Sequence, residues 1–426
     1  MTPSSHLGDH LVPAPPRSGP RFPALDTLRL VGALCVLTTH VAFWSGDYTR
    51  HGVWGTLLAR LDVGVAIFFV LSGFLLARPW IMAGLDAAPR PDPLSYLRRR
   101  WWRIAPLYLL TVALALALVE DNRGLGWGER VSTVLMLDTV TSTSFPAGLT
   151  HMWSLAVEVS FYLLLPLLML LLLGRTGRGP TSTRRIWTGL LAMTVVSVWW
   201  HLDGAARVGS STGGSPTQWL PAFLTWFAIG IALALLQVLL VRGRSPRAAG
   251  AVHALAHQPG ACWALAAGLL LASATPVAGP AMFAAPTPAQ SLTKHLLYAA
   301  VALLVVLPSI LGRREHSRYD TVLSATPLRR LGWISYGVFC LHLPVLHLVM
   351  WATGWELFAG RGLQIFVVTV LLSLLAAEAA YRFVELPALA LGRRPSRFTR
   401  NRGTRTGPSA ADDDASASAA SAGTQR

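Results

Sequence analysis

Three ionisable side chains stand in parts of the sequence that are otherwise apolar. His40 lies inside the first long apolar run, and Arg100 and Arg103 stand three residues apart where the third run begins. An ionisable residue within a membrane is a candidate for function, and a histidine titrates where a general base must work. Guanidinium groups hold phosphate through paired hydrogen bonds. These residues predict transfer from a phosphate-bearing donor, across or within the bilayer.

Long helices are needed to position these side chains, and the composition supplies them. The chain is 53% hydrophobic and only 13% charged, which is not a soluble globular profile. Most apolar runs have roughly the length that a hydrocarbon core of about 30 Å requires. We therefore predict an all-α, multi-pass bundle in the cell membrane. The ten expected spans are Leu28–Trp44, Leu61–Trp80, Ile104–Val119, Trp153–Leu173, Ile186–Trp200, Trp219–Val241, Ala261–Thr275, Leu296–Leu311, Leu331–Trp351 and Leu363–Leu386.

The basic residues sort by loop rather than by domain. If the N-terminus is cytoplasmic, 29 of the 36 Lys and Arg residues fall on the inner side. This is the positive-inside pattern, and it predicts an even number of spans with both termini cytoplasmic. The net charge of +16 is then explained by topology and by attraction to anionic lipid head groups. We expect no nucleic-acid partner.

The spans place the candidate residues at different depths. His40 follows Asp26 by 14 residues, or about 21 Å along a helix axis, so it is expected in the outer half of the bilayer. A structural histidine bonded to a helix carbonyl would fit the same position. Arg100 and Arg103 share one helix face. Plain anchoring at the inner surface would explain both, although Arg103 directly precedes Ile104 and so lies at the hydrocarbon edge.

A second group of polar residues opens the fourth span. Glu158 stands inside that span, and an ionised carboxylate there needs a partner. It would either orient His40 or pair with an arginine for folding alone. Ser154 and Trp153 precede it by about one turn, and His151 lies at the water boundary. His151 would either contact an acceptor or serve as a solvated cap.

The ninth and tenth spans add further polar positions. Tyr336 and His342 lie in the ninth span, where Pro344 frees a backbone carbonyl that His342 is expected to serve. A structural role for His342 is favoured over a catalytic one. In the tenth span, Arg382 and Glu385 are three residues apart and are expected to pair near the inner face.

The remaining features bound the domain. The cysteines Cys35, Cys262 and Cys340 show no metal-binding spacing, so we expect neither a disulfide framework nor a metal site. Residues 1–22 and 392–426 are rich in small and polar residues and are expected to be disordered tails. The membrane domain is therefore placed at 23–391.

Six motifs in order resemble the acyltransferase 3 family of integral membrane acyltransferases. They cover residues 25 to 387, nearly the whole membrane part. Individually each motif is weak, but the order is specific. The matching pieces are Leu25-Asp-Thr-Leu-Arg29 leading to His40, Gly64-Val-Ala-Ile-Phe-Phe-Val-Leu-Ser-Gly-Phe74, Arg100-Trp-Trp-Arg-Ile-Ala-Pro106, His151-Met-Trp-Ser-Leu-Ala-Val-Glu-Val-Ser-Phe-Tyr162, Ser335-Tyr336 with His342 and Pro344, and Arg382-Phe-Val-Glu-Leu-Pro387.

The resemblance implies O-acylation, often O-acetylation, of a carbohydrate-type hydroxyl. The donor would be cytoplasmic acyl-CoA, such as acetyl-CoA, acting as a co-substrate, with no permanently bound cofactor. The acceptor would be an envelope polysaccharide, a glycolipid or a glycosylated metabolite. The family's essential residues map onto His40, Arg100 and Arg103. Some members carry an extracytoplasmic hydrolase-like domain. We expect none here, which leaves direct transfer or a separate extracytoplasmic partner open.

The expected mechanism assigns each candidate a role. Arg100 and Arg103 bind the CoA phosphates, and His40, with Glu158 as its orienting partner, deprotonates the acceptor hydroxyl. Acylation of His40 itself is the alternative. The candidate acceptor-binding residues are His151, Trp153, Ser154, Tyr336 and His342. Two other classes remain open: a transporter or exporter that uses intramembrane His, Glu and Arg, and a structural membrane protein.

Overall fold

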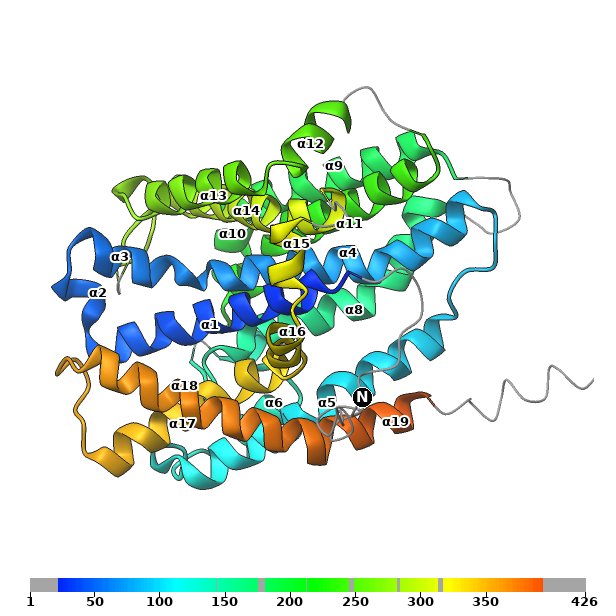
Figure 1. Ribbon diagram of the computed structural model, residues 1–426. Helices are drawn as coiled ribbons and strands as arrows, with labels where there is room; N and C mark the ends of the chain where they lie inside the picture. Colours follow the sequence, from blue (N-terminus) through cyan, green and yellow to red (C-terminus); the bar gives the residue numbers. More distant parts are fainter. Residues whose placement is uncertain are drawn as a thin grey trace, which may run out of the picture. The chain divides into compact units, whose positions relative to one another are not determined.

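The computed structural model describes residues 22–142, 144–174, 181–211, 213–244, 249–281, 284–312 and 317–393. Within these ranges every regular element is a helix, and the long helices run side by side (Figure 1). The predicted all-α membrane fold is confirmed. The expected tails lie almost wholly outside the described residues, and the chain up to Gly392 forms one unit.

Eight helical segments are long and apolar enough to cross a membrane. They are built from α1 (Ala24–Ser45), α3 with α4 (Val53–Ala59, Gly64–Leu85), α5 (Pro93–Leu118), α8 (Met152–Leu173), α11 (Leu220–Val241), α14 (Pro288–Leu311), α17 (Ser335–Thr353) and α18 with α19 (Gly362–Ala380, Leu386–Arg393). The shorter helices are α2 (Asp47–Arg50), α6 (Trp127–Val134), α7 (Asp138–Thr141), α9 (Thr183–Trp199), α10 (Ala205–Gly209), α12 (Ala249–Ala256), α13 (Pro259–Ser273), α15 (Arg318–Leu323) and α16 (Thr326–Trp333). Single turns of other helix types are η1 (Arg60–Val63), η2 (Glu120–Asn122), η3 (Trp200–Gly204), η4 (Pro216–Gln218), η5 (Pro276–Ala278) and η6 (Tyr381–Glu385).

In the described residues eight helical segments, or nine if α12 and α13 form one span, meet the length and apolar composition of a membrane span, compared with the ten expected ranges. Each expected range overlaps a helix, and the one at Ile186–Trp200 is covered by α9, which has 17 residues. The range expected at Ala261–Thr275 corresponds to α13, which meets α12 at a 92° bend and would make a ninth span only together with it. The expected ninth span also begins too early, because α16 ends at Trp333 and runs across the long helices instead of continuing into α17 (Figure 1).

Helix α1 carries His40, and a polar contact holds each of its ends. Asp26 lies in its first turn, where a carboxylate complements the helix dipole, and accepts a hydrogen bond from the Trp333 indole at 3.2 Å. At the other end Gly46 adopts a left-handed conformation with φ of 80° and donates its N–H to the Phe43 carbonyl at 3.0 Å. These contacts fix the height of His40 in the bundle.

Helices α4 and α11 cross closely because a glycine lies at the crossing. A Cβ atom on Gly230 would overlap the Val70 carbonyl oxygen and meet the Phe74 nitrogen at 2.7 Å. Gly230 therefore allows the two backbones to touch. This contact aligns the face of α4 that lines the site.

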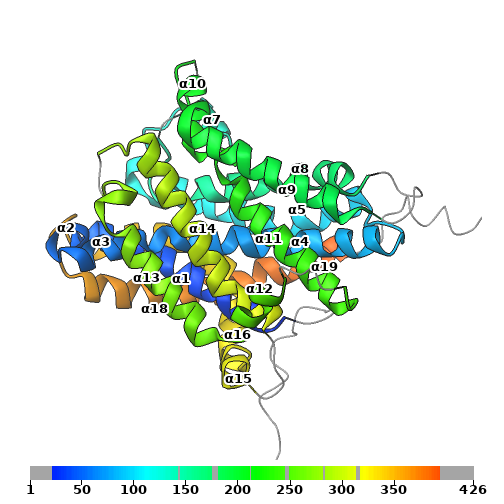
Figure 2. The ribbon, with the colours of Figure 1, turned by 90° about the horizontal axis from the view of Figure 1, so that it is seen from above.

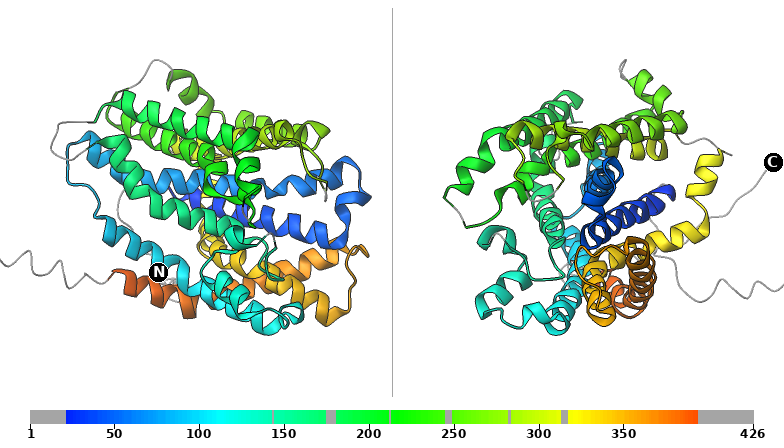
Figure 3. Two further views of the ribbon diagram at one scale, coloured as in Figure 1. Left: turned by 180° about the vertical axis from the view of Figure 1, so that it is seen from behind. Right: turned by 90° about the vertical axis from the view of Figure 1, so that its left-hand side faces the viewer.

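The core consists of two apolar clusters, and α1 contributes residues to both. Seen along the long helices, α1 and α4 occupy the middle of the bundle (Figure 3). One cluster centres on α4, α8, α11 and α14, and the other joins α1, α17 and α18. Helices α13 and α14 pack side by side along one face of the bundle (Figure 2). The candidate residues lie where the two clusters adjoin, a boundary that we call the seam.

Candidate functional site

Two cavities lie on the seam, each toward a different end of the bundle. The inner cavity, of about 80 Å³, lies toward the end where α5 begins. The outer cavity, of about 440 Å³, lies toward the end that carries α2 and α3. Inner-cavity residues are Arg29, Val65, Phe68, Phe69, Ser72, Arg100, Arg103, Ile104, Ser154, Leu155, Glu158, Tyr162, Ser335, Tyr336 and Phe339.

The outer cavity has a polar wall and an apolar wall. Thr39, Tyr48 and Asp62 contribute polar groups to its lining, whereas the apolar lining includes Ala278, Pro280, Ala281, Ala284 and Pro286. His40, His151 and Trp153 also line this cavity. Val65 and Ser154 line both cavities, so the two cavities adjoin at these residues.

His40 belongs to a cluster of three histidines at the junction. The His40 and His342 ring centroids are 5.2 Å apart, those of His40 and His151 are 6.2 Å apart, and those of His151 and His342 are 4.6 Å apart. The side chains of His151 and His342 are buried. The sequence singled out each of the three residues, but only the fold brings them together.

Backbone carbonyls select the tautomers of His342 and His40. His342 Nδ1 lies 2.7 Å from the Phe339 carbonyl, so it carries the proton and leaves Nε2 as an acceptor. His40 Nδ1 lies 2.7 Å from the Val36 carbonyl and 3.2 Å from His342 Nε2. His40 Nδ1 therefore donates to both acceptors, and its Nε2 keeps a lone pair that can accept a proton.

His151 is held by the carbonyl that Pro344 frees. A proline has no N–H for the carbonyl four residues earlier, which here is that of Cys340. His151 Nε2 donates to this carbonyl at 3.2 Å. The expected partner of the freed carbonyl was His342, so that expectation is wrong: His342 instead uses the Val338 and Phe339 carbonyls. In the described part of the chain, His151 Nδ1 has no hydrogen-bond partner.

Three guanidinium groups converge on the inner cavity. Arg100 and Arg103 lie on the face of α5 that lines it, and Arg29 reaches it from α1. Among the described residues, neither Arg29 nor Arg100 forms an ion pair, whereas Arg103 pairs with Glu385 at 3.2 Å. The two unpaired cations are suited to bind an anion such as a phosphate.

The expected pairing of Arg382 with Glu385 is not observed. Arg382 pairs instead with Glu378, one helical turn earlier, and Arg330 pairs with the same carboxylate at 2.5 Å. Glu385, on the same turn η6 as Arg382, is buried and pairs with Arg103 instead. The π-helical turn rotates the side chains away from the positions that an unbroken α-helix would give.

Glu158 lines the inner cavity rather than contacting His40. Its carboxylate accepts hydrogen bonds from the Ser72 hydroxyl and, at 2.7 Å, from the Tyr162 hydroxyl. Among the described residues it makes neither a hydrogen bond to His40 nor an ion pair with an arginine. The expected contact that orients His40 is therefore supplied by His342.

The other candidate residues divide between the cavities. Trp153 lines the outer cavity and stacks on Phe223 with centroids 5.2 Å apart. Ser154 lies at the junction and donates to the His151 carbonyl at 3.0 Å. Tyr336 lines the inner cavity, where its hydroxyl donates to the Ile104 carbonyl at 2.9 Å.

An acidic group in the outer cavity was not foreseen. The Asp62 carboxylate pairs with Lys294 at 2.7 Å and accepts a hydrogen bond from the Tyr298 hydroxyl. Nearby, the Tyr48 hydroxyl donates to the Thr39 carbonyl at 2.8 Å. Burial raises the pKa of Tyr48, so this phenol stays neutral and remains a hydrogen-bond donor. The cavity therefore offers both donors and acceptors to a polar ligand.

The sequence did contain a pattern that could have identified Arg29 as a site residue. Arg29 precedes His40 by 11 residues, which is close to three whole helical turns, so both side chains lie on one face of α1 about 16 Å apart. No comparable signal exists for Asp62, because Lys294 and Tyr298 lie more than 230 positions away. In the described part of the chain, no three His, Cys, Asp or Glu side chains are arranged to hold a metal ion.

Comparisons with known proteins point to one family. The sequence profile described as "Acyltransferase domain" matches residues 22–378. Acyltransferase MdmB of Streptomyces mycarofaciens is 27% identical, and the match covers 93% of this chain and 97% of that protein. A Bacillus subtilis protein with the provisional name peptidoglycan O-acetyltransferase YrhL is also 27% identical, over 86% of this chain and 54% of its own length.

A third relative extends the same pattern. O-acetyltransferase OatA of Staphylococcus aureus is 22% identical, over 86% of this chain and 57% of its own length. The chain thus spans little more than half of YrhL and OatA, but almost all of MdmB. No solved structure matches the chain.

Proposed function

We propose a reaction for this chain, which belongs to the acyltransferase family that its sequence matches over residues 22–378. The protein transfers an acyl group, such as acetyl, from cytoplasmic acyl-CoA to a hydroxyl group of a carbohydrate-type acceptor. The acceptor would be an envelope polysaccharide, a glycolipid or a glycosylated metabolite. One observation carries the proposal. A small basic cavity and a larger polar cavity adjoin at Val65 and Ser154, next to the three histidines.

The inner cavity supplies the donor side. Arg29 and Arg100 have no ion-pair partner among the described residues, so they can offer charge-assisted hydrogen bonds to CoA phosphates. The cavity is small, and beyond the arginines its walls include Val65 and Phe339. A thin pantetheine arm suits such a passage and would carry the thioester to the junction.

The histidine cluster supplies the proton transfer. His40 Nε2 takes the proton of the acceptor hydroxyl as its oxygen attacks the thioester carbon. The new C–O bond forms, the C–S bond breaks, and the proton passes from His40 to the thiolate of CoA. His342 holds His40 in the reactive tautomer, and the Val36 carbonyl and His342 Nε2 continue to accept from Nδ1–H when His40 is protonated.

The outer cavity supplies the acceptor side. Its hydroxyl, carboxylate and ammonium groups suit a ligand with several hydroxyls, and Trp153 offers an aromatic face. The names of YrhL and OatA, which both refer to O-acetylation, support an oxygen acceptor. The positive-inside rule predicts that the inner cavity, which the arginines line, faces the cytoplasm. The outer cavity then faces away from the cytoplasm.

The first test is CoA release by the purified full-length protein with acetyl-CoA and a panel of sugar acceptors. We expect acceptor-dependent release that falls about 100- to 10,000-fold in His40→Ala, the range expected for loss of a general base. Arg100→Ala should weaken acetyl-CoA binding by about 10- to 100-fold, since hydrogen bonds between charged groups are worth about 1.5–3 kcal/mol.

Arg99→Ala is the matched control for Arg100→Ala. Arg99 is the neighbouring residue of α5, is exposed, and does not line the inner cavity. Equal losses in both variants would reduce the arginines to a general basic surface and contradict the proposal. Uptake or efflux by vesicles without acyl-CoA, together with full activity of His40→Ala, would favour a transporter. CoA release in the absence of acceptor, followed by a stable acyl-protein, would favour prior acylation of His40 over direct transfer.

A further inference from the structure

Two phenylalanine rings close the inner cavity beneath the histidine cluster. Phe68 and Phe339 both line the cavity and meet edge to face, with centroids 5.8 Å apart. The Phe339 ring also lies 5.1 Å from the His151 ring and 6.2 Å from the His342 ring. Phe339 therefore contacts both the inner cavity and two of the histidines, and Phe68 packs against it.

The acyl group of a bound donor would lie against this aromatic pair. The inferred donor enters from the arginines, and the hydroxyl activated by His40 arrives through the outer cavity. The thioester carbon must then lie near Val65 and Ser154, which line both cavities. The acceptor occupies the outer side of that carbon, so the alkyl part of the acyl group is left with the inner walls.

Those walls leave little room and have little freedom to move. The whole inner cavity measures only about 80 Å³. Phe68 packs against both apolar clusters of the core, and Phe339 is only 7% exposed. A Cβ atom on Gly32 would lie 3.3 Å from the Phe68 ring, so α1 also supports this ring closely. Interiors packed in this way resist expansion.

We infer that Phe68 and Phe339 form the end wall of the acyl-group pocket and restrict the donor to short acyl chains such as acetyl and propionyl. This inference rests on the proposed acyl-CoA reaction and adds to it the two residues that set chain length. Replacing either ring with a small side chain opens room for several methylene groups. Longer acyl donors should then fit without any change at the arginines or at His40.

The experiment measures acyl-CoA binding, because it does not require the acceptor to be known. Purified full-length protein is loaded with radiolabelled acetyl-CoA, which is displaced by unlabelled acetyl-, butyryl-, hexanoyl- and octanoyl-CoA. For the wild type we expect hexanoyl-CoA to compete at least tenfold less well than acetyl-CoA. In Phe339→Ala and Phe68→Ala, hexanoyl-CoA should compete at least tenfold better than in the wild type, with acetyl-CoA affinity changed much less.

Two further variants keep the test informative. Phe339→Leu keeps more of the core filled if the alanine variant fails to fold, and it should shift the preference toward butyryl-CoA. Phe366→Ala makes the same substitution at a partly buried phenylalanine of α18 that lines neither cavity, and it should keep the wild-type preference.

The outcomes separate this inference from the proposed function. Wild-type protein that binds hexanoyl-CoA as well as acetyl-CoA would overturn it, since the chain would then extend elsewhere, for instance into the outer cavity. Folded variants that keep the wild-type preference would also overturn it, while acetyl-CoA binding itself still supports the proposed function. Wild-type protein that binds no acyl-CoA would remove both.

Discussion

The contact between His342 and His40 gives His342 a positioning role that can be measured apart from folding. His342 Nε2 accepts from His40 Nδ1 at 3.2 Å, while its own Nδ1 is held by the Phe339 carbonyl. His342→Leu removes the acceptor but keeps much of the volume. We expect kcat to fall about tenfold, because a neutral hydrogen bond is worth about 0.5–1.5 kcal/mol. The KM for acyl-CoA should stay unchanged.

A rescue and a control distinguish positioning from packing. His342→Gln restores a side-chain acceptor and should recover much of kcat, which a merely structural role for His342 would not produce. His347→Leu is the control, because His347 lies on the same helix, stacks edge-on against Trp44 and lines neither cavity. If His342→Leu and His342→Gln lost the same activity, the hydrogen bond between His40 and His342 would have no catalytic importance.

At the scale of the element, Pro344 links the shape of α17 to the position of His151. The missing N–H of Pro344 leaves the Cys340 carbonyl available, and His151 Nε2 lies 3.2 Å from it. Pro344→Ala restores a helical N–H that competes for this carbonyl. We expect activity to fall several-fold while the melting temperature stays the same or rises, measured by CoA release and by thermal unfolding in detergent.

The same substitution elsewhere in the bundle provides the comparison. Pro166 lies inside α8 and lines neither cavity. Pro166→Ala should therefore change stability without a specific loss of activity. A Pro344→Ala protein with full activity would show that the proline shapes α17 for packing alone.

The crossing of α4 and α11 is a second feature at this scale. A Cβ on Gly230 would overlap the backbone of α4, whereas a Cβ on Gly268 of α13 would meet nothing within 4 Å. Gly230→Ala should destabilise the bundle by about 1–3 kcal/mol, as overpacking does. Gly268→Ala should stabilise it slightly, by about 0.5–1 kcal/mol, because alanine favours a helix interior. Thermal unfolding of both variants in the same detergent tests this contrast, and equal shifts would contradict it.

At the scale of the whole molecule, the sequence predicted the class of fold better than it predicted the contacts between distant segments. Apolar runs and basic loops report burial in lipid and the side of the membrane, so the helices could be predicted and His40, Arg100 and Arg103 could be selected one by one as candidates. Contacts between distant segments leave no such local pattern. His342 meets His40 across 302 positions, and Arg103 meets Glu385 across 282.

Local irregularities explain the remaining errors. The π-helical turn η6 directs Arg382 and Glu385 to different partners, and no residue pattern in that segment predicts a π-helical turn. The break between Trp333 and α17 likewise follows from packing of α16 against α1 rather than from hydropathy. Spacing could have found Arg29, because a three-turn interval from His40 is a feature of sequence alone.

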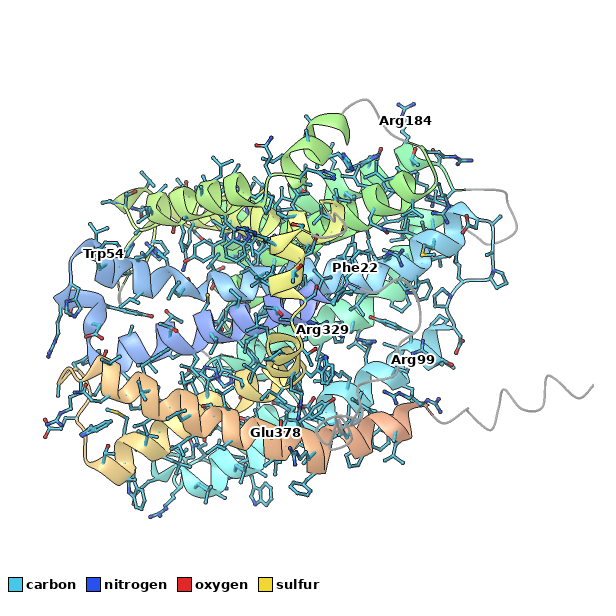
Figure 4. The ribbon with its side chains drawn as sticks, viewed as in Figure 1. Phe22, Trp54, Arg99, Arg184, Arg329 and Glu378 are labelled. Atoms are coloured by element: carbon cyan, nitrogen blue, oxygen red, sulfur yellow. The ribbon has the colours of Figure 1, made fainter. Side chains whose placement is uncertain are left out.

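The orientation of the bundle in the membrane decides whether the two cavities can receive donor and acceptor from different sides. Trp54 lies at one end of the long helices, and Arg99 and Arg184 lie at the other (Figure 4). The excess of arginine at the second end predicts that it faces the cytoplasm. We therefore expect a membrane-impermeant maleimide to label Trp54→Cys in right-side-out membranes and Arg184→Cys only in inverted ones.

The native cysteines should contribute little to this labelling, because Cys262 and Cys340 are buried and Cys35 is only partly exposed. The unsubstituted protein serves as the control for background labelling. The reversed pattern would place Arg29, Arg100 and Arg103 outside the cell, where acyl-CoA is not supplied. The inner cavity would then have to bind a different anion, and the outer cavity would open toward the cytoplasm. The expected pattern instead makes the junction at Val65 and Ser154 the place where a cytoplasmic donor meets an extracytoplasmic hydroxyl, with His40 on the acceptor side.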